Sequence, residues 1–317
     1  MRKTRIFALL LVLCLLLTGC GSTQTPLERT AEYLKTAVPE PDFGSLDGDW
    51  IVFGLARAGA DLSDDYFERY YSAVEAAVQA ADGKLDENRY TEYSRLILAL
   101  TAIGRDPRNV GGYDLLLPLA DLKKTTAQGV NGAAFALLAL DCGGYELPQN
   151  SAAAVQATRD GYVDAILTRQ NADGGWSLGG GASDPDLTAM ALQALAGYRS
   201  RTDVSASADA GLSCLAQMQQ EDGAFLSWGA ESSESVSQVL VALTALGLSP
   251  DDARFVKNGQ TLEEVLLRFA QNDGSFVHTQ GDGGNLLATT QAFYALAAVQ
   301  RARDGKTSLY DMSDVAP

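Results

Sequence analysis

Four of the Asp-Gly steps along this chain stand in a matching local context. A large apolar residue stands two positions after each glycine, and in three copies a glutamine stands four positions before it. The steps are Asp82-Gly83, Asp173-Gly174, Asp222-Gly223 and Asp273-Gly274, the apolar residues are Leu85, Trp176, Phe225 and Phe276, and the glutamines are Gln79, Gln170 and Gln219. Asp-Gly favours a tight reversal because glycine accepts positive φ angles. A turn repeated in one context predicts a repeat architecture, in which each unit buries its apolar face against the next.

A helical segment rich in Ala and Leu follows each turn. From the Asp of each step to a shared alanine the separation is 20 to 23 residues, and two further segments fit the same helix without the full turn. The six anchor alanines are Ala56, Ala102, Ala139, Ala194, Ala245 and Ala295. Amphipathic stretches with helical spacing lie between these segments, and strand signals are nearly absent. The sequence therefore predicts an all-α fold of about six helical hairpins.

One flank of these Ala/Leu-rich segments is mildly polar. Eight residues before an anchor alanine, or one residue before it, stand Ser94, Asn131, Asp186, Ser237, Thr101, Gln193, Thr244 and Tyr294. Such a flank suits helices that surround a partly wet centre. It equally suits core helices that reach a domain surface, so both interpretations stay open.

The N-terminus has the organisation of an export signal. Three basic residues precede an apolar run from Ile6 to Leu17, which is short for a membrane span. The run ends in Leu17-Thr18-Gly19-Cys20, which resembles the lipobox of bacterial lipoproteins and implies a diacylglycerol thioether on Cys20. An ordinary secretory signal or an uncleaved anchor helix are the alternatives. We expect a signal peptide at 1–19, a tether at 20–29, a repeat domain at 30–303 and a disordered tail at 304–317.

The charge limits the classes of partner. The formal charge is −16, and removing the three basic residues within 1–19, with no acidic ones, leaves −19. Such a surface repels nucleic-acid phosphates and is not attracted to anionic lipid. We expect no nucleic-acid partner, an extracytoplasmic location held by the lipid alone, at the cell surface or in the periplasm, and a small molecule, a glycan or an extracellular protein as partner.

Cysteine use is sparse beyond the expected anchor. Cys142 and Cys214 both lie in Ala/Leu-rich helical sequence, which favours buried free thiols. One bridge between them is the alternative, and neither has a metal-ligand spacing.

The segment Gln170-Asn171-Ala172-Asp173-Gly174-Gly175-Trp176 has the form Q-x-x-x-G-x-W. It resembles the QW motif of squalene and oxidosqualene cyclases and the repeats of protein prenyltransferase β-subunits. The resemblance covers most of the mature chain and implies an α/α toroid, an α6/α6 barrel of six inner and six outer helices. The motif has a structural role, in which the glutamine satisfies backbone groups at a helix end. We expect the turns to be held by Gln79, Gly83, Gln170, Gly174, Gln219, Gly223 and Gly274.

The resemblance also implies chemistry that can be sought in the residues. Class II cyclases protonate a polyene with a D-x-D-D element, and the nearest match, Ser183-Asp184-Pro185-Asp186-Leu187, lacks the last acid. A catalytic acid there must stay protonated in a dry pocket. Asp184 and Asp186 fall at an expected helix start, where Asp is a common N-cap and is stabilised in its ionised form. We therefore interpret both as caps.

Other activities of related folds lack their residues. Protein prenyltransferases hold zinc through Asp, Cys and His, but His278 is the single histidine and has no cysteine near it in sequence, so we expect no metal site. No nucleophile motif supports a Ser-His-Asp triad around His278, and the C-G-E-Q element of thioester domains is absent. Acids that recur as equivalents within repeats favour capping over the carboxylate pair of glycosidases. Cobalamin carriers use a related helical barrel for binding alone.

In toroids of this superfamily, ligands occupy the mouth of the lumen, near the N-termini of the inner helices. Gly-rich loops after three of the turns reach that region, and flexible solvated loops are the alternative interpretation. The candidates for a ligand mouth are Trp176, Asp184, Asp186, Trp228, Glu231, Glu234, His278, Asp282 and Asn285. The leading hypothesis is a lipid-anchored binding module without catalytic residues or cofactor. The alternative is an enzyme resembling squalene or terpene cyclases or prenyltransferases.

Overall fold

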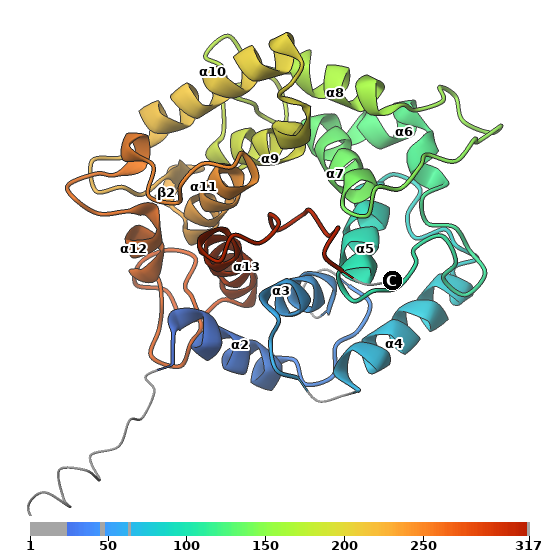
Figure 1. Cartoon of the computed structure of the whole chain (residues 1–317), viewed down its shortest axis with the longest axis horizontal. Coiled ribbons are helices and arrows are strands. Elements are labelled where there is room, and N and C mark those ends of the chain that lie inside the picture. The colour runs from blue at the N-terminus through green and yellow to red at the C-terminus, as the bar shows by residue number, and fades with distance from the viewer. Residues whose placement is uncertain (1–23, 45–47, 63–64, 316–317) are drawn as a thin grey trace, which may run out of the picture.

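Helical hairpins close into a ring around a common centre (Figure 1). The computed structural model describes residues 24–44, 48–62 and 65–315, and the expected signal peptide and Cys20 lie outside these residues. Within the described ranges, the inner helices are α3 (Trp50–Ala58), α5 (Thr91–Ala102), α7 (Gly129–Asp141), α9 (Pro185–Leu195), α11 (Ser233–Ala245) and α13 (Leu286–Arg303). Each inner helix contacts the inner helix on either side, including α13 against α3, so the ring is closed. This confirms the all-α, α/α-toroid fold predicted from the sequence.

Outer segments surround the inner helices. They are α2 (Pro26–Ala37), α4 (Tyr66–Ala80), the single turn α6 (Leu122–Thr125), α8 (Arg159–Leu167), α10 (Thr202–Met218) and α12 (Leu262–Leu267). Short 3-10 turns lie at η2 (Pro118–Ala120), η3 (Thr126–Gln128), η4 (Ala196–Tyr198) and η5 (Ala253–Phe255), and one small hairpin joins β1 (Leu226–Ser227) to β2 (Ala230–Glu231). In the part of the chain that the structure describes, no helix is long and apolar enough to span a bilayer.

Three of the Asp-Gly turns share one geometry. Gly174, Gly223 and Gly274 have φ angles of 90°, 92° and 93°. In each turn the Asp carboxylate accepts a hydrogen bond from the backbone N–H two residues later, at 3.0–3.1 Å. Gln170 Nε2 donates to the carbonyl of Gly174 at 2.7 Å and to that of Ser207 on α10 at 2.9 Å. The glutamine therefore ties its own turn to the next outer helix.

The same glycines leave no space for a side chain. A Cβ at Gly174 would lie 2.7 Å from the carbonyl oxygen of Ala210 in α10. The last turn makes the corresponding contact with the first helix, because a Cβ at Gly274 would lie 2.5 Å from the carbonyl oxygen of Arg29 in α2. These close approaches let each hairpin pack directly on its successor.

The first Asp-Gly turn departs from this geometry. Helix α4 continues through Gln79 to Ala80, and both Asp82 and Gly83 have positive φ angles, of 50° and 71°. Gln79 Nε2 reaches only the carbonyl of Gly111, at 3.5 Å. Gln79 is placed differently from Gln170 and Gln219 because it lies within α4, whereas those two glutamines follow the ends of their helices.

The C-terminal segment was expected to be disordered, and the structure corrects this. Residues 304–315 follow α13 and cross the centre of the ring where the inner helices end (Figure 1); we call this end the tail face and the opposite end the mouth. Leu309, Tyr310 and Met312 are buried there. Asp314 pairs with both Arg57 and Arg301, whose hydrogen bonds and charges outweigh its burial and hold the Asp314 pKa at about 2. The segment is polar on average, but its apolar residues Leu309, Tyr310 and Met312 pack in the lumen.

We predict that Gly174→Ala destabilises the fold by at least about 2 kcal/mol, because the new side chain needs a positive φ angle and overlaps α10. Gly197→Ala is the matched control, since a Cβ there meets nothing within 4 Å, and it should be neutral or stabilising by up to about 1 kcal/mol. Urea unfolding followed by circular dichroism measures both. Equal stability of the two variants would contradict the close packing described for this turn.

Candidate functional site

A cavity of about 130 Å³ opens at the mouth of the ring. Its wall comes from the first halves of the inner helices: Trp50 opens α3, Asp186 is the second residue of α9 and Leu287 is the second residue of α13. The lining residues are Trp50, Phe135, Asp186, Met190, Gln238, Leu287, Thr290, Gln291 and Tyr294. Asp186 and Tyr294 belong to the mildly polar helix flank, and Thr101 and Gln193 of the same flank line cavities at the tail face. Four of the eight flank residues therefore line cavities, whereas Ser94 and Ser237 are fully buried.

Aromatic rings fill the lumen below this cavity. The Trp50 ring lies 5.7 Å from that of Phe135, 6.2 Å from that of Tyr294 and 5.7 Å from that of Phe53, between centroids. Phe53 in turn stacks on Tyr310 of the C-terminal segment at 5.4 Å. A continuous aromatic column thus runs from the mouth cavity to the tail face, and its rings close the inner end of the cavity.

Asp186 carries a half-buried carboxyl group, and one of its oxygens makes no hydrogen bond. Its Oδ1 atom is inaccessible to solvent and has no hydrogen-bond partner. Burial raises the Asp186 pKa to about 6. The neighbouring Ser235 hydroxyl opposes this rise, the charges of Asp184 and Glu234 add to it, and His278 lowers the pKa. The expectation that Asp186 is an N-cap is therefore wrong, because its side chain lines the cavity and the cap of α9 is Asp184. Asp184 alone caps α9, accepting from the N–H groups of Asp186 and Leu187 at 3.0 and 3.1 Å.

Asp49 offers a comparison within the same fold. It is fully buried, and burial also raises its pKa. Its carboxylate, however, accepts from Arg95 Nε at 2.6 Å and from Tyr70 Oη at 2.7 Å, so it cross-links α3, α4 and α5. A buried acid with a structural role is partnered in this protein, and Asp186 Oδ1 is not.

Glu234 and His278 form a pair next to Asp186. Glu234 is 6% exposed, and its Oε2 lies 2.8 Å from His278 Nδ1. The same oxygen accepts from the hydroxyl groups of Ser232 and Ser233 at 3.1 and 3.2 Å. His278 is thus held by a carboxylate and is not a lone loop residue. The serine hydroxyls bond to the glutamate and not to the histidine, so they do not complete a nucleophile–base pair.

Glutamines on neighbouring inner helices satisfy one another beside the cavity. Gln238 Nε2 donates to Tyr294 Oη at 2.6 Å and to Gln291 Oε1 at 2.9 Å. Gln193 Nε2 donates to Gln238 Oε1 at 3.0 Å. These hydrogen bonds fix the wall of the cavity and leave the Asp186 carboxylate as its unpartnered polar group.

The remaining predicted mouth residues occupy the rim, with one exception. Trp228 is 97% exposed at the tip of the β1–β2 hairpin, Glu231 lies in β2, and Asp282 lies exposed in the loop before α13. Asn285 caps α13 by accepting from the N–H of Ala288 at 3.0 Å. Trp176 is the exception and a correction, because it is fully buried in the core and its Nε1 donates to the Ile166 carbonyl at 2.9 Å.

Sequence reasoning missed the aromatic wall of the cavity. Trp50 stands two positions after the glycine of an Asp47-Gly48 step that lacks the preceding glutamine, and Phe135 lies in a segment interpreted only as helix. The signal that could have found Phe135 is its position four residues before an anchor alanine, which places it on the same face as Asp186, eight residues before its own anchor.

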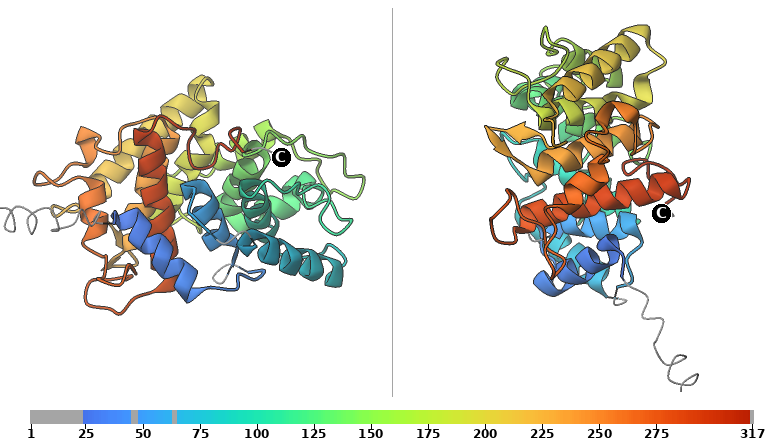
Figure 2. Two further views of the ribbon diagram at one scale, coloured as in Figure 1. Left: turned by 60° about the horizontal axis from the view of Figure 1, so that its bottom comes forward. Right: turned by 90° about the vertical axis from the view of Figure 1, so that its left-hand side faces the viewer.

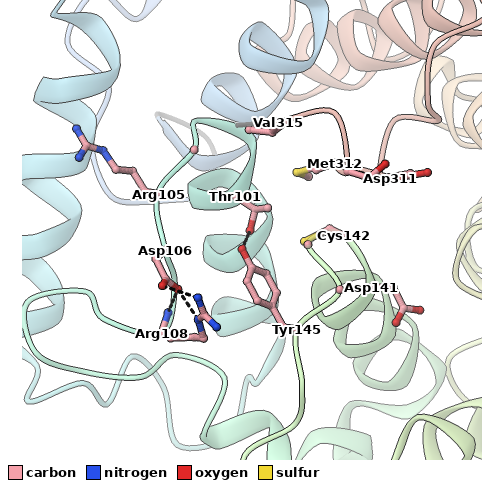
Figure 3. Close-up of a pocket in the computed structure, with 14 residues that line it drawn as sticks. Thr101, Arg105, Asp106, Arg108, Asp141, Cys142, Tyr145, Asp311, Met312 and Val315 are labelled. Carbon is pink, nitrogen blue, oxygen red and sulfur yellow. Dashed lines mark hydrogen bonds and ion pairs between the residues drawn. The ribbon is translucent and has the colours of Figure 1, made fainter. Parts of the chain in front are cut away.

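Two larger cavities flank the C-terminal segment at the tail face, with volumes of about 520 and 600 Å³. Figure 3 shows the first, where Thr101 and Tyr145 hydrogen-bond at 2.9 Å and Arg108 pairs with Asp106 at 2.8 Å. Asp141, which borders both, accepts from Arg159 and Tyr198 at 2.7 Å. Among the described residues, no buried side-chain polar atom that lines either cavity lacks a partner. Neither cavity therefore has a buried polar side chain whose hydrogen bond only a ligand could complete.

Cys142 and Cys214 are buried free thiols, as the sequence favoured. Across the described ranges, no three His, Cys, Asp or Glu side chains are grouped as metal ligands.

We predict that Asp186→Asn stabilises the protein by up to about 3 kcal/mol above pH 6, because it removes a carboxylate that ionises more easily in the unfolded chain. The folded pKa of about 6 lies above the ordinary value of 3.8. The gain should therefore be complete above pH 6 and fade as the pH falls towards 4. Thermal and urea unfolding at pH 5 and pH 8 measure it. A gain of the same size at both pH values would show that the buried charge is not its cause.

Comparison with known proteins places this ring in a family. Residues 116–313 match the family model of the prenyltransferase alpha-alpha toroid domain. Copalyl diphosphate synthase of Streptomyces cyslabdanicus is 28% identical over 296 residues, which cover 90% of this chain and 52% of that protein. Drimenyl diphosphate synthase of Streptomyces showdoensis is 30% identical over 155 residues, which cover 47% of this chain and 28% of that protein. The chain spans about half the length, or less, of these curated relatives.

Solved structures share the fold at low sequence identity. Candida albicans protein geranylgeranyltransferase-I complexed with GGPP has a TM-score of 0.60 at 12% identity, covering 89% of this chain and 93% of that one. Unsaturated glucuronyl hydrolase from Bacillus sp. GL1 has a TM-score of 0.56 at 14% identity, covering 92% and 98%. These likenesses show the fold alone. Because the family model matches more than half of its residues, this chain belongs to the prenyltransferase α-α toroid family.

Proposed function

We propose that this protein is a lipid-anchored, extracytoplasmic binding module that takes a group of a small-molecule ligand into the mouth cavity. The observation that carries the proposal is the mouth cavity itself, in which the half-buried Asp186 carboxyl group lies beside the rings of Trp50, Phe135 and Tyr294. A carboxylate in the wall offers a ligand a charged acceptor, which makes stronger hydrogen bonds than a neutral one. Binding sites commonly combine apolar walls with a few such polar groups.

The position of the anchor supports an outward-facing mouth. The N-terminal end of α2 lies nearer the tail face than its C-terminal end does, as both views in Figure 2 show. Cys20 precedes the first residue of α2 by six positions, so an extended tether reaches only about 20 Å. A lipid on Cys20 would therefore hold the tail face towards the membrane. The mouth, with its exposed Trp228 hairpin, would face the surroundings.

The cavity size favours binding over cyclisation. Sites for drug-sized ligands measure roughly 300–1,000 Å³, and the mouth cavity measures about 130 Å³. The aromatic column occupies the space below it. The cavity can take a group of a few heavy atoms, whereas an isoprenoid chain would have to leave most of its length outside.

Acid-initiated chemistry on an isoprenoid is the second candidate function. Asp186 is the second acid of the D-x-D pattern, lies beside aromatic rings and has a pKa raised to about 6, which brings it closer to a general acid than to an ordinary aspartate. The names of two relatives, copalyl and drimenyl diphosphate synthase, point to isoprenoid diphosphates. Under this hypothesis the Asp186 carboxyl would donate a proton to a double bond at the mouth.

Binding and turnover can be measured on the same sample. We expect the full chain in a neutral detergent to gain thermal stability with a ligand from a small-molecule and glycan panel, and to leave squalene, farnesyl diphosphate and geranylgeranyl diphosphate unchanged. A ligand present at 100 times its Kd would raise the free energy of unfolding by about 2.7 kcal/mol. Gas chromatography–mass spectrometry detects products. A cyclised product that disappears in Asp186→Asn would reject the binding module and establish the second candidate.

Cys20→Ala tests the anchor. Without the thiol no thioether to diacylglycerol can form, so we expect the variant to lose lipid labelling and to leave the membrane fraction. Ser22→Ala, in the same short segment, is the control and should remain membrane-bound. Membrane retention of Cys20→Ala equal to that of the unaltered protein would contradict lipid anchoring.

A further inference from the structure

We propose that the mouth cavity binds a small alkyl-substituted cationic group, such as a quaternary ammonium, between the Asp186 carboxylate and the rings of Trp50, Phe135 and Tyr294. The inference rests on the proposed function, because it names the chemistry of the group that enters the cavity. Aromatic faces attract a cation through their negative quadrupole, and the attraction grows when water is excluded.

The charges around the cavity select the sign of the ligand. No lysine or arginine stands in the lining. Asp186 and Glu234 both lie at this site, and Asp184 caps the same helix close by. His278 is the facing basic group, and it is already held by Glu234. An anionic group such as a phosphate would meet carboxylates without a compensating cation.

The polar groups of the wall argue against a sugar hydroxyl. A hydroxyl ligand needs paired donors and acceptors in the wall. Gln238 Nε2 already donates to Gln291 Oε1 and to Tyr294 Oη, and the charged acceptor of the wall is the Asp186 carboxylate. A metal ion is equally unsuited, because across the described ranges no group of three ligating side chains is present. One acceptor among three rings matches a cation that carries alkyl groups and needs few hydrogen bonds.

The volume fits the same class of ligand. About 130 Å³ corresponds to roughly four water molecules, which is the scale of a compact cationic head. Leu287 lines the cavity and is 39% exposed, so the remainder of a longer ligand can pass out beside it.

Ionisation of Asp186 should set the pH dependence. The facing groups are Asp184 on α9, Glu234 on α11, His278 in the loop before α13 and Tyr294 on α13. A cation favours the ionised Asp186 carboxylate, and a proton competes with it. We expect affinity to be steady above pH 7 and to fall about tenfold for each pH unit below the Asp186 pKa of about 6.

The test compares a cation with its neutral isostere. The full chain in a neutral maltoside detergent is titrated with choline and with 3,3-dimethyl-1-butanol, and Trp fluorescence and calorimetry follow binding. We expect choline to bind at least tenfold more tightly than the alcohol. Asp186→Asn and Trp50→Leu should each weaken choline at least tenfold. Asp209→Asn removes an exposed carboxylate on α10, outside the cavity lining, and should change the affinity less than threefold.

The outcomes separate this inference from the proposed function. Equal binding of choline and the alcohol would overturn the cationic ligand. The cationic ligand would also be rejected if choline did not bind but a neutral or anionic compound bound in a way that depends on Asp186. In that case the proposed binding module would still stand. If no compound binds and the protein shows turnover, both proposals fail together.

Discussion

The packing of each bent glycine against the next outer helix determines the shape of this molecule. Gly174 lies on α10, Gly223 on α12 and Gly274 on α2, each without room for a Cβ atom. Because the last of these contacts reaches the first helix, the same local interaction that advances the ring also closes it. A wider turn would separate the hairpins and leave the apolar faces of the inner helices without neighbours. The lumen and its mouth cavity therefore depend on backbone contacts that lie far from them.

The closed ring could be predicted from the sequence because its determinants are local and repeated. Asp-Gly, the preceding Gln and the aromatic residue recur at similar spacing, and each copy needs only its neighbours to adopt its conformation. The direction of Asp186 could not be predicted in this way. Asp184 and Asp186 share a helix start, but two residues turn a helix by about 200°, so one caps the end while the other faces the lumen. That rotation is set by the packing of α9 between α7 and α11, which no local pattern encodes.

The tail and the aromatic wall escaped prediction for a related reason. Residues 304–317 are mostly polar, and average composition hides Leu309, Tyr310 and Met312. Trp50 follows an Asp-Gly step that lacks the preceding glutamine. Both features acquire meaning only when segments distant in sequence meet, as Tyr310 does on Phe53. The two buried acids show the same limit, because the partners of Asp49 come from two other helices, whereas Asp186 Oδ1 has none.

The C-terminal segment has a kinetic consequence for anything that uses the lumen. Because Tyr310 and its neighbours obstruct one end and the aromatic column occupies the middle, the cavity is a dead-end recess with a single doorway. A ligand must therefore enter and leave through the same opening, and a second molecule cannot displace it from the opposite side. Residence time would thus be governed by the loops around the rim, the hairpin that carries Trp228 among them, and changes there should alter how long an occupant stays more than how well it fits.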